Sequence, residues 1–367
     1  HSFAFLTEAN YISIWNLKQG KEYYNLPLKN ISPIDIAINH HNNELFIVDK
    51  NGKLFKKTIF SEDALKRYKP IRSIDTYNQV KSVNLTQVIS SDSQLIISPN
   101  IATKKPFTYK LPSSIKSFDI SSDAKKIVVA TDKKVYLYHL INLNKLQEVK
   151  QWDMSQEISQ VIIDDLTSSI AIKFESSLFS SGGYGLIVKS KGDDKNYVNA
   201  KIYSDSILNF GFTNNGYLGL YTKNQDVFYH HLSTGEVKNK FSINNFNTQL
   251  VQFPLTDRFI YLPIREKGIH LINTQTVKKQ AQLVSTKNGW AILDNSGRYD
   301  GNEEALSDIS WEINGEMFEL DRFSKRYFEP GLLAKVIYNS SQLNPKKSIK
   351  KPFKVKKMIT KPADKLE

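Results

Sequence analysis

A repeat of short strand-like segments limits the folds open to this chain of 367 residues more than any other feature of its sequence. Four segments share one form, an alternating apolar run followed by a polar residue: Ile12–Gly20, Val135–Leu140, Val227–Gly235 and Ile269–Thr274. Once these are aligned, the polar anchor residues Asn16, His139, His231 and Asn273 are separated by 123, 92 and 42 positions. The intervals are three, two and one units of about 41–46 residues, the length of four short strands and their turns.

Further anchors fill the gaps in the repeat. Steps of about 41 positions from Asn16 reach Lys57 and then Ser98, and both lie inside strand-like runs. The remaining anchor, near position 187, falls in Tyr184–Val188. Seven anchors on short strands, separated by Asn, Asp, Gly and Ser, predict an all-β chain folded as a seven-bladed β-propeller.

The two ends of the repeat predict how the ring closes. His1–Leu6 opens directly into a strand, so the first blade lacks a strand before it. Trp290–Leu293 follows the last repeat and is placed to supply the missing strand. Closure would remove the free sheet edges that otherwise pair with other chains, and the propeller is therefore expected to span residues 1–301.

The anchor segments also resemble those of the WD40 family. Trp15-Asn16 stands where that family has Trp-Asp, and the likeness in spacing runs from Phe3 to about Leu283. The likeness in motif is strongest at Ile12–Gly20 and Val227–Gly235, whereas the other segments lack the pair and no Gly-His dipeptide precedes a blade. The resemblance implies a degenerate WD40-like propeller, a rigid scaffold whose loops carry the function.

A second resemblance covers the C-terminal part. Gly289–Gly301 reads GWAILDNSGRYDG and Phe318–Leu333 reads FELDRFSKRYFEPGLL. Together they resemble the segment that follows the propeller in bacterial WD40-repeat proteins that often carry a caspase-like peptidase domain. A caspase-type peptidase needs a His–Cys pair, and this chain has no cysteine. The resemblance thus implies a binding or regulatory propeller, with the peptidase either lost or beyond the end of this fragment.

The side-chain spacing of the same region predicts a helical strap over residues 302–338. Leu320, Phe323, Tyr327 and Phe328 have the spacing of an amphipathic helix. Pro330-Gly331 ends that helix, and a short second helix is expected to begin at Leu332. We expect the strap to pack on the propeller.

The net charge of +13 is unevenly distributed. The chain from position 340 onward carries nine lysines against Asp364 and Glu367, a net charge of +7, which leaves +6 for the rest. Residues 339–367 are predicted to form a flexible tail that is either a solvated linker or a contact for an acidic protein or an anionic membrane surface. Nucleic acid is disfavoured because Phe353 is the only aromatic residue among these lysines. The candidate partner-binding residues of the tail are Lys346, Lys347, Lys350, Lys351, Lys354, Lys356 and Lys357.

No catalytic, metal-binding or cofactor-binding residues are predicted. His139, His230, His231 and His270 lie on expected third strands, where polar residues usually hydrogen-bond to blade turns. Gly182–Gly185 leads into a strand, which disfavours a phosphate loop because no helix N-terminus follows. Adjacent carboxylates point apart on strands and turns, so they predict solvated turns rather than acid–base pairs; they are Asp164-Asp165, Asp193-Asp194 and Glu303-Glu304.

These observations predict a non-catalytic protein-binding scaffold, a subunit of a multi-protein bacterial assembly whose partners are other protein subunits. The alternative is a sensor propeller of a caspase-like peptidase system, and a third hypothesis is a propeller enzyme with its active site in the central channel. The sequence has no apolar run of about 18 residues that could cross a membrane. The absence of cysteine favours a periplasmic or envelope location over the cytoplasm.

Overall fold

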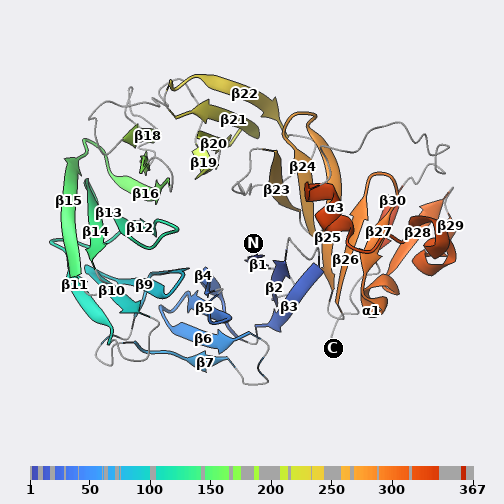
Figure 1. Cartoon of the computed structure of the whole chain (residues 1–367), viewed down its shortest axis with the longest axis horizontal. Coiled ribbons are helices and arrows are strands. Elements are labelled where there is room, and N and C mark those ends of the chain that lie inside the picture. Colours follow the sequence, from blue (N-terminus) through green and yellow to red (C-terminus); the bar gives the residue numbers. More distant parts are fainter. Residues whose placement is uncertain are drawn as a thin grey trace. The chain divides into compact units, whose positions relative to one another are not determined.

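The computed structural model shows an all-β chain with a β-propeller arrangement (Figure 1). It describes residues 2–6, 11–16, 21–28, 30–39, 41–59, 61, 65–70, 74, 76–99, 105–141, 145–164, 168–174, 186–189, 207–213, 216–232, 234–243, 258–264, 268–286, 289–313, 316–338 and 357–360. The chain divides into two compact units, residues 30–242 and residues 1–29 with 243–367. None of the helices described is long and apolar enough to span a membrane.

In the unit of residues 30–242, the described residues form five antiparallel sheets that follow one another along the chain. The first sheet is β4 (Pro33–Asn39), β5 (Glu44–Asp49), β6 (Leu54–Thr58) and β7 (Lys66–Arg67). The second is β8 (Gln79–Val83), β9 (Thr86–Ser91), β10 (Gln94–Pro99) and β11 (Phe107–Lys110). The third is β12 (Ser117–Ile120), β13 (Lys126–Ala130), β14 (Lys134–Ile141) and β15 (Lys145–Asp153). The fourth is β16 (Ile158–Ile163), β17 (Ile170–Phe174) and β18 (Leu186–Lys189), and the fifth is β19 (Ile207–Phe212), β20 (Tyr217–Thr222), β21 (Asp226–His231) and β22 (Val237–Ser242).

Five of the seven predicted anchors lie on the third strand of their sheet among the described residues, whereas Asn16 and Asn273 lie on second strands. Lys57, Ser98, His139 and His231 lie on β6, β10, β14 and β21, and each of these is the third strand of its sheet. Position 187 lies on β18, the third strand of the fourth sheet. Within this unit the first strand of each sheet is innermost and the last is outermost (Figure 1).

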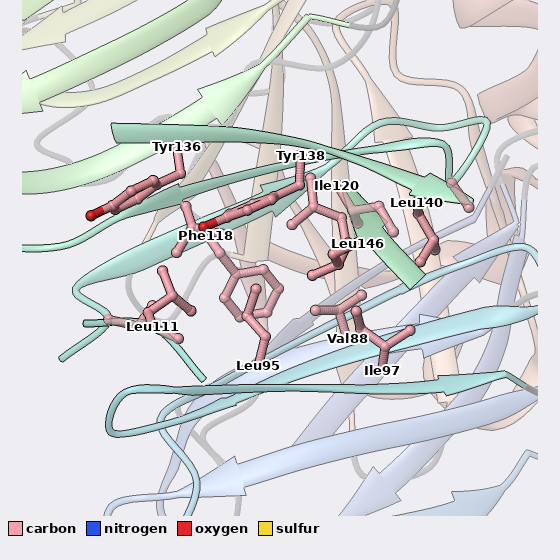
Figure 2. Packing of buried hydrophobic residues seen from close by; sticks show 14 residues of the cluster. Val88, Leu95, Ile97, Leu111, Phe118, Ile120, Tyr136, Tyr138, Leu140 and Leu146 are labelled. Carbon is pink, nitrogen blue, oxygen red and sulfur yellow. The ribbon is translucent and has the colours of Figure 1, made fainter. Parts of the chain in front are cut away.

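Apolar side chains between neighbouring sheets form the core of this unit. Between the second and third sheets, Val88, Leu95 and Ile97 pack against Phe118 and Tyr138 (Figure 2). Similar clusters separate the other consecutive sheets of the unit. Because both faces of a blade are covered in this way, its middle strands are buried along their whole length, as β5 and β9 are.

The other unit contains the first and the last sheets of the repeat. The first is β1 (Ser2–Leu6), β2 (Tyr11–Asn16) and β3 (Lys21–Pro27), and the last is β23 (Phe259–Ile264), β24 (Gly268–Asn273), β25 (Lys278–Thr286), β26 (Gly289–Asp294) and β27 (Tyr299–Gly301). Trp15 is fully buried, and its ring meets the edge of Trp290 at a centroid distance of 5.8 Å. The hydroxyl of Ser285 also donates a hydrogen bond to Oε1 of Glu22 at 2.7 Å, so side chains join the two sheets.

The blade count and the closing strand differ from the prediction. The propeller arrangement has six blades, whereas the repeat predicts seven. The first sheet, β1–β3, has three strands among the described residues. Trp290–Leu293 does not complete it, because these residues lie in β26, which pairs with β25. Thr286 and Gly289 are paired across a connection of two residues, so a tight hairpin makes β25 the local partner.

The region predicted as a helical strap contains strands as well as helices. Its elements are α1 (Glu303–Leu306), β28 (Ile309–Ile313), β29 (Glu316–Glu319), the 3₁₀ helix η3 (Leu320–Phe323), α2 (Ser324–Tyr327) and α3 (Leu332–Tyr338). The predicted helix over Leu320–Phe328 and the second helix from Leu332 are present, while the hairpin of β28 and β29 was missed. Within residues 339–367, the predicted tail, β30 (Lys357–Thr360) pairs with β28.

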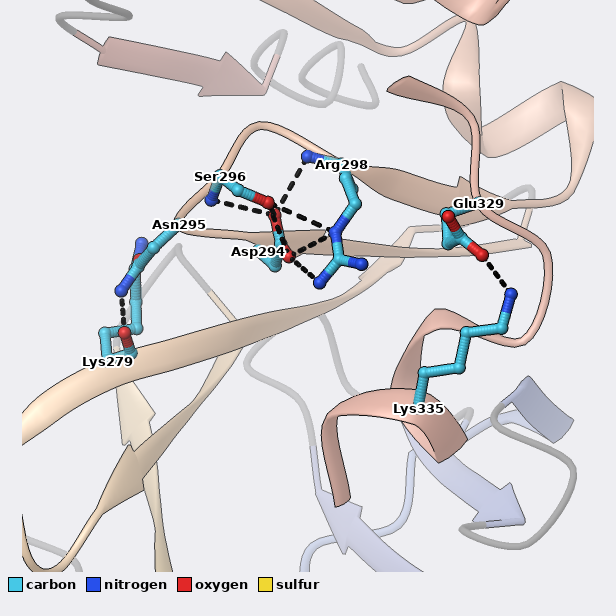
Figure 3. Close-up of polar contacts among 7 residues, drawn as sticks. All are labelled: Lys279, Asp294, Asn295, Ser296, Arg298, Glu329 and Lys335. Carbon is cyan, nitrogen blue, oxygen red and sulfur yellow. Dashed lines mark hydrogen bonds and ion pairs between the residues drawn. The ribbon is translucent and has the colours of Figure 1, made fainter. Parts of the chain in front are cut away.

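Buried polar groups hold the strap to the last sheet. The hydroxyl of Tyr299 donates a hydrogen bond to the carbonyl of Leu320 at 2.7 Å. Oδ2 of Asp300 accepts hydrogen bonds from the N–H groups of Gly331 and Leu332, at 2.7 and 3.3 Å, and so caps α3. Figure 3 shows one contact within each part, the ion pair of Asp294 with Arg298 at 2.7 Å in the last sheet and the contact of Glu329 with Lys335 in the strap.

Candidate functional site

A series of hydrogen bonds connects the innermost strands of residues 30–242. Oδ2 of Asp35 on β4 accepts from the N–H of Val80 on β8 at 2.8 Å. Oε1 of Gln79 on β8 accepts from the N–H of Phe118 on β12 at 3.2 Å. Oγ of Ser117 on β12 accepts from the N–H of Val161 on β16 at 3.2 Å. Each bridge therefore satisfies a backbone donor on the next sheet with a side chain from the previous one.

One more bridge reinforces the last step of this series. Oδ2 of Asp119, two residues after Ser117 on β12, accepts from the N–H of Ile163 on β16 at 3.1 Å. The β12–β16 step thus has two side-chain bridges. We call the four hydrogen bonds the inner-strand bridges.

The inner-strand bridges border a cavity of about 430 Å³, the inner-strand cavity. Its lining comes from β4, β8, β12, β16 and the residue before β8: Ile34, Asp35, Asn78, Gln79, Lys81, Ser117, Phe118, Ser159, Gln160, Val161 and Ile162. Ile34 is 58% exposed, which is unusual for a large apolar side chain in this protein. The cavity thus combines an exposed apolar residue with amide, hydroxyl and ammonium groups.

Asp35 and Lys81 determine the electrostatics of the cavity. Burial raises the pKa of Asp35 above its usual value, although Lys81 and the N–H groups of Val80 and Ile36 oppose this change. Both carboxylate oxygens of Asp35 accept backbone hydrogen bonds, one from Ile36 and one from Val80. We therefore assign Asp35 a structural role and assign the charge offered to a ligand to Lys81.

A second concave region lies at the outer side of the same unit. It has a volume of about 560 Å³ and is lined from β11, the turn after it, β14 and β15. We call it the tyrosine groove, because the lining residues include Tyr109, Tyr136 and Tyr138. In Figure 2 the hydroxyl groups of Tyr136 and Tyr138 point the same way, toward the end of the cluster where Leu111 lies.

The histidines singled out in the sequence have local contacts. Nδ1 of buried His230 lies 3.1 Å from the carbonyl of Gly235, in the turn after β21, which is the blade-to-turn contact predicted. Burial lowers the pKa of His230. His231 is less buried and packs edge-on against Tyr217, so the two neighbours point to opposite faces. His139 is exposed, and His270 is buried on β24.

The other sequence candidates do not converge. Among the described residues there is no group of three or more His, Cys, Asp or Glu side chains that could hold a metal ion. Gly182–Gly185 and Asp193-Asp194 lie outside the described residues, as do six of the candidate tail lysines: Lys346, Lys347, Lys350, Lys351, Lys354 and Lys356. Lys357 is the first residue of β30.

Sequence reasoning missed the residues that build the inner-strand cavity. A signal was nevertheless present, because Asp35, Gln79 and Ser117 recur near the starts of successive first strands at nearly the spacing of the blade repeat. A search for polar residues in phase with the repeat, as well as for anchors, would have found them.

Comparison with known proteins gives the fold. No family model matches the sequence, and no curated protein matches it. Among solved structures, the crystal structure of Saccharomyces cerevisiae Sqt1, a WD40-type propeller, is similar with a TM-score of 0.54 and 10% sequence identity. The likeness covers 73% of this chain and 84% of that one. In all, 1742 chains of solved structures match, so the likeness identifies a β-propeller and does not choose among functions.

Proposed function

We propose that this chain is a WD40-like, non-catalytic scaffold of a multi-protein bacterial assembly, and that it binds a segment of a partner protein at the inner-strand cavity. The observation that carries the proposal is the exposed Ile34 beside the side-chain amides of Asn78 and Gln160. An amide side chain offers both a donor and an acceptor, which matches the N–H and C=O groups of an extended polypeptide. Ile34 offers apolar contact area to a side chain of the same segment.

The chemistry of the cavity supports binding more than catalysis. Asp35, its one carboxylate, already accepts two backbone hydrogen bonds. Its lining contains no histidine. General acid–base catalysis needs a titratable group that can reach the substrate, and a carboxylate engaged in holding two strands together is poorly placed for that task.

Site-specific photo-cross-linking in the native cells tests the proposal. A photoreactive phenylalanine derivative replaces Ile34, and in a matched control it replaces Val237, which is 46% exposed on β22 at the outer side of the same unit. We expect a defined partner protein to be cross-linked at position 34 and not at position 237. Equal cross-linking of the same proteins at both positions would contradict binding at the cavity.

A second variant pair tests the contribution of the cavity to partner recovery. Ile34→Asp places a charge on the apolar contact, and Val237→Asp places the same charge on the control surface. We expect Ile34→Asp to reduce the amount of co-purified partner by about tenfold, the effect of losing roughly 1.4 kcal/mol of binding free energy. Val237→Asp is expected to leave it unchanged.

The lysine-rich tail adds a further part to this proposal. The tail lysines from Lys346 to Lys357 are proposed to contact an acidic protein or another anionic surface, supported by the net charge of +7 from position 340 onward. The division into a propeller of residues 1–301, a strap of residues 302–338 and a tail also stays a proposal. Removing residues after 338 and repeating the co-purification measures the contribution of the tail.

A further inference from the structure

The positive charge of the chain before its tail is concentrated in one stretch of sequence. Residues 104–150 contain ten lysines, no arginine and four carboxylates, a net charge of +6. The net charge of the whole chain is +13, and the part from position 340 carries +7 of it. The remaining residues are therefore neutral as a group. All of the excess positive charge outside the tail belongs to residues 104–150, which form parts of the second and third sheets of residues 30–242 and the links beside them.

The tyrosine groove lies in this basic region. Lys110 and Lys134 line it, and Glu148 is the only carboxylate in its lining. Lys134 is 45% exposed and forms an ion pair at 3.2 Å with Asp153, which is 75% exposed, so both groups are largely solvated. An exposed pair of this kind holds its partners weakly, and Lys134 can turn to an incoming carboxylate at little cost.

The three tyrosines of the groove differ in exposure. Tyr109 is half-buried, whereas Tyr136 and Tyr138 are only 4% and 1% exposed as whole residues, and their rings stack on each other at a centroid distance of 5.9 Å. Tyr138 also meets the edge of Tyr109 at a centroid distance of 5.2 Å. Burial raises the pKa of both Tyr136 and Tyr138, so these phenols remain protonated hydrogen-bond donors at physiological pH.

The arrangement of charges and donors points to one class of partner. We infer that the tyrosine groove is a second docking surface, which binds an acidic, extended segment of a partner protein through Lys110, Lys134 and the hydroxyls of Tyr109 and Tyr136. Carboxylates of the segment match the two ammonium groups, and its backbone carbonyls accept from the phenols. Single-stranded nucleic acid fits less well, since it needs exposed aromatic faces on which bases stack, and Tyr136 and Tyr138 are buried.

This inference extends the proposed scaffold function, since a scaffold with two separate surfaces can hold two partners. It does not depend on the inner-strand cavity, because none of the strands that line the groove also lines that cavity. The two proposals can therefore fail separately.

Fluorescence anisotropy with three labelled probes tests the inference on the full chain. The probes are a peptide of alternating Glu and Ser, its counterpart of alternating Lys and Ser, and a single-stranded oligouridine. Because the tail is itself basic, each probe is measured on the full chain and on the variants below, and only the difference between variants is interpreted. We expect the Glu–Ser peptide to bind with an affinity that falls as salt concentration rises.

Matched pairs of variants locate the binding. Lys110→Gln with Lys134→Gln removes two charges from the groove, and Lys223→Gln with Lys238→Gln removes two exposed lysines from the region of β20–β22. We expect the groove pair to weaken binding of the Glu–Ser peptide by roughly tenfold and the control pair to change it by less than about twofold. Tyr136→Phe removes a hydroxyl without changing the packing of the ring, and it should weaken binding by about threefold.

Three outcomes would overturn the inference. The first is an equal loss of peptide binding in the groove pair and the control pair, which would indicate non-specific attraction to lysine. The second is tighter binding of oligouridine than of the Glu–Ser peptide with the same dependence on Lys110 and Lys134, which would indicate a nucleic-acid surface. The third is loss of peptide binding in Lys81→Gln alone, which would place the acidic segment at the inner-strand cavity and leave the proposed function standing.

Discussion

The carboxylate of Asp35 on β4 accepts a hydrogen bond from the N–H of Val80 on β8, 45 residues away, at 2.8 Å. The N–H of Val80 belongs to a first strand, which has a partner strand on one side only. A side chain from the neighbouring sheet thus satisfies a donor that strand pairing leaves open. Gln79 and Ser117 repeat the arrangement on the next two sheets, so the inner ends of the blades are linked in sequence order.

Replacing Asp35 with Ala should lower the free energy of unfolding of residues 30–242 by about 1–3 kcal/mol, the cost of leaving a buried backbone donor without an acceptor. Urea unfolding followed by tyrosine and tryptophan fluorescence measures the change. Asp153→Ala, which removes a carboxylate that is 75% exposed, is the matched control and should cost less than about 1 kcal/mol. Equal effects of the two variants would show that the bridge contributes no more than a surface ion pair.

The strands of the repeat were predictable because their side chains alternate and their anchors recur at a constant interval. His139 and His231 show this, since both lie on third strands as the spacing predicts. The pairing of Trp290–Leu293 was not predictable from the same evidence. Periodicity identifies a strand, but it does not say which neighbour the strand will join, and the short connection to Thr286 decided in favour of β25.

Gly268 is expected to tolerate no side chain. Its φ is +80°, and a Cβ there would lie 2.1 Å from the carbonyl oxygen of Leu283, which belongs to the paired strand β25. Gly331 in the same unit has a similar φ of +72° but no atom within 4 Å of the position of a Cβ. Gly331→Ala should lower the free energy of unfolding by roughly 1 kcal/mol, because it changes only the backbone conformation. Gly268→Ala should lower it by well over that amount, because it adds a steric clash. Thermal unfolding of the two variants side by side tests this, and similar losses would show that the strands separate easily.

The candidate site was less predictable than the fold. The residues of the inner-strand cavity come from four sheets, and only the blade arrangement brings Asn78 near Gln160. The tyrosine groove was concealed for a different reason, because Tyr136 and Tyr138 alternate within β14 as any core residues would. Only the structure shows that both residues, although buried, also border a groove. The charge of residues 104–150 can be counted from the sequence, but only the structure shows that two of these lysines line a groove.

Tyr299→Phe should loosen the strap without creating a cavity. The substitution removes the buried hydrogen bond from the hydroxyl to the carbonyl of Leu320 and leaves that carbonyl without this donor, at a cost of about 1–3 kcal/mol. Limited proteolysis of the strap should then proceed faster than in the wild-type protein. Tyr327→Phe, which keeps the ring contact with Trp311, is the control and should cleave at the wild-type rate. Unchanged cleavage in Tyr299→Phe would show that apolar packing alone holds the strap.

The cap of α3 predicts a dependence of stability on pH. Burial raises the pKa of Asp300, although the N–H groups of Gly331, Gly301 and Leu332 and the charge of Lys335 oppose this. A carboxyl whose pKa is higher in the folded state than in the unfolded state binds its proton more tightly when folded. Its contribution to stability is therefore complete below the unfolded-state pKa of about 3.9 and is lost as pH rises through the folded-state value.

Comparison of the wild-type protein with Asp300→Asn isolates this group, because all other carboxyl groups titrate in both proteins. The advantage of the wild-type protein in free energy of unfolding should be largest near the acidic end of the range and should shrink as pH rises toward neutrality. Urea unfolding at a series of pH values measures it, with Glu303→Gln, an exposed carboxylate in the same unit, as the control for loss of a negative charge. An advantage that grows with pH would mean that the three N–H donors outweigh burial, and that Asp300 caps α3 as a stabilised anion.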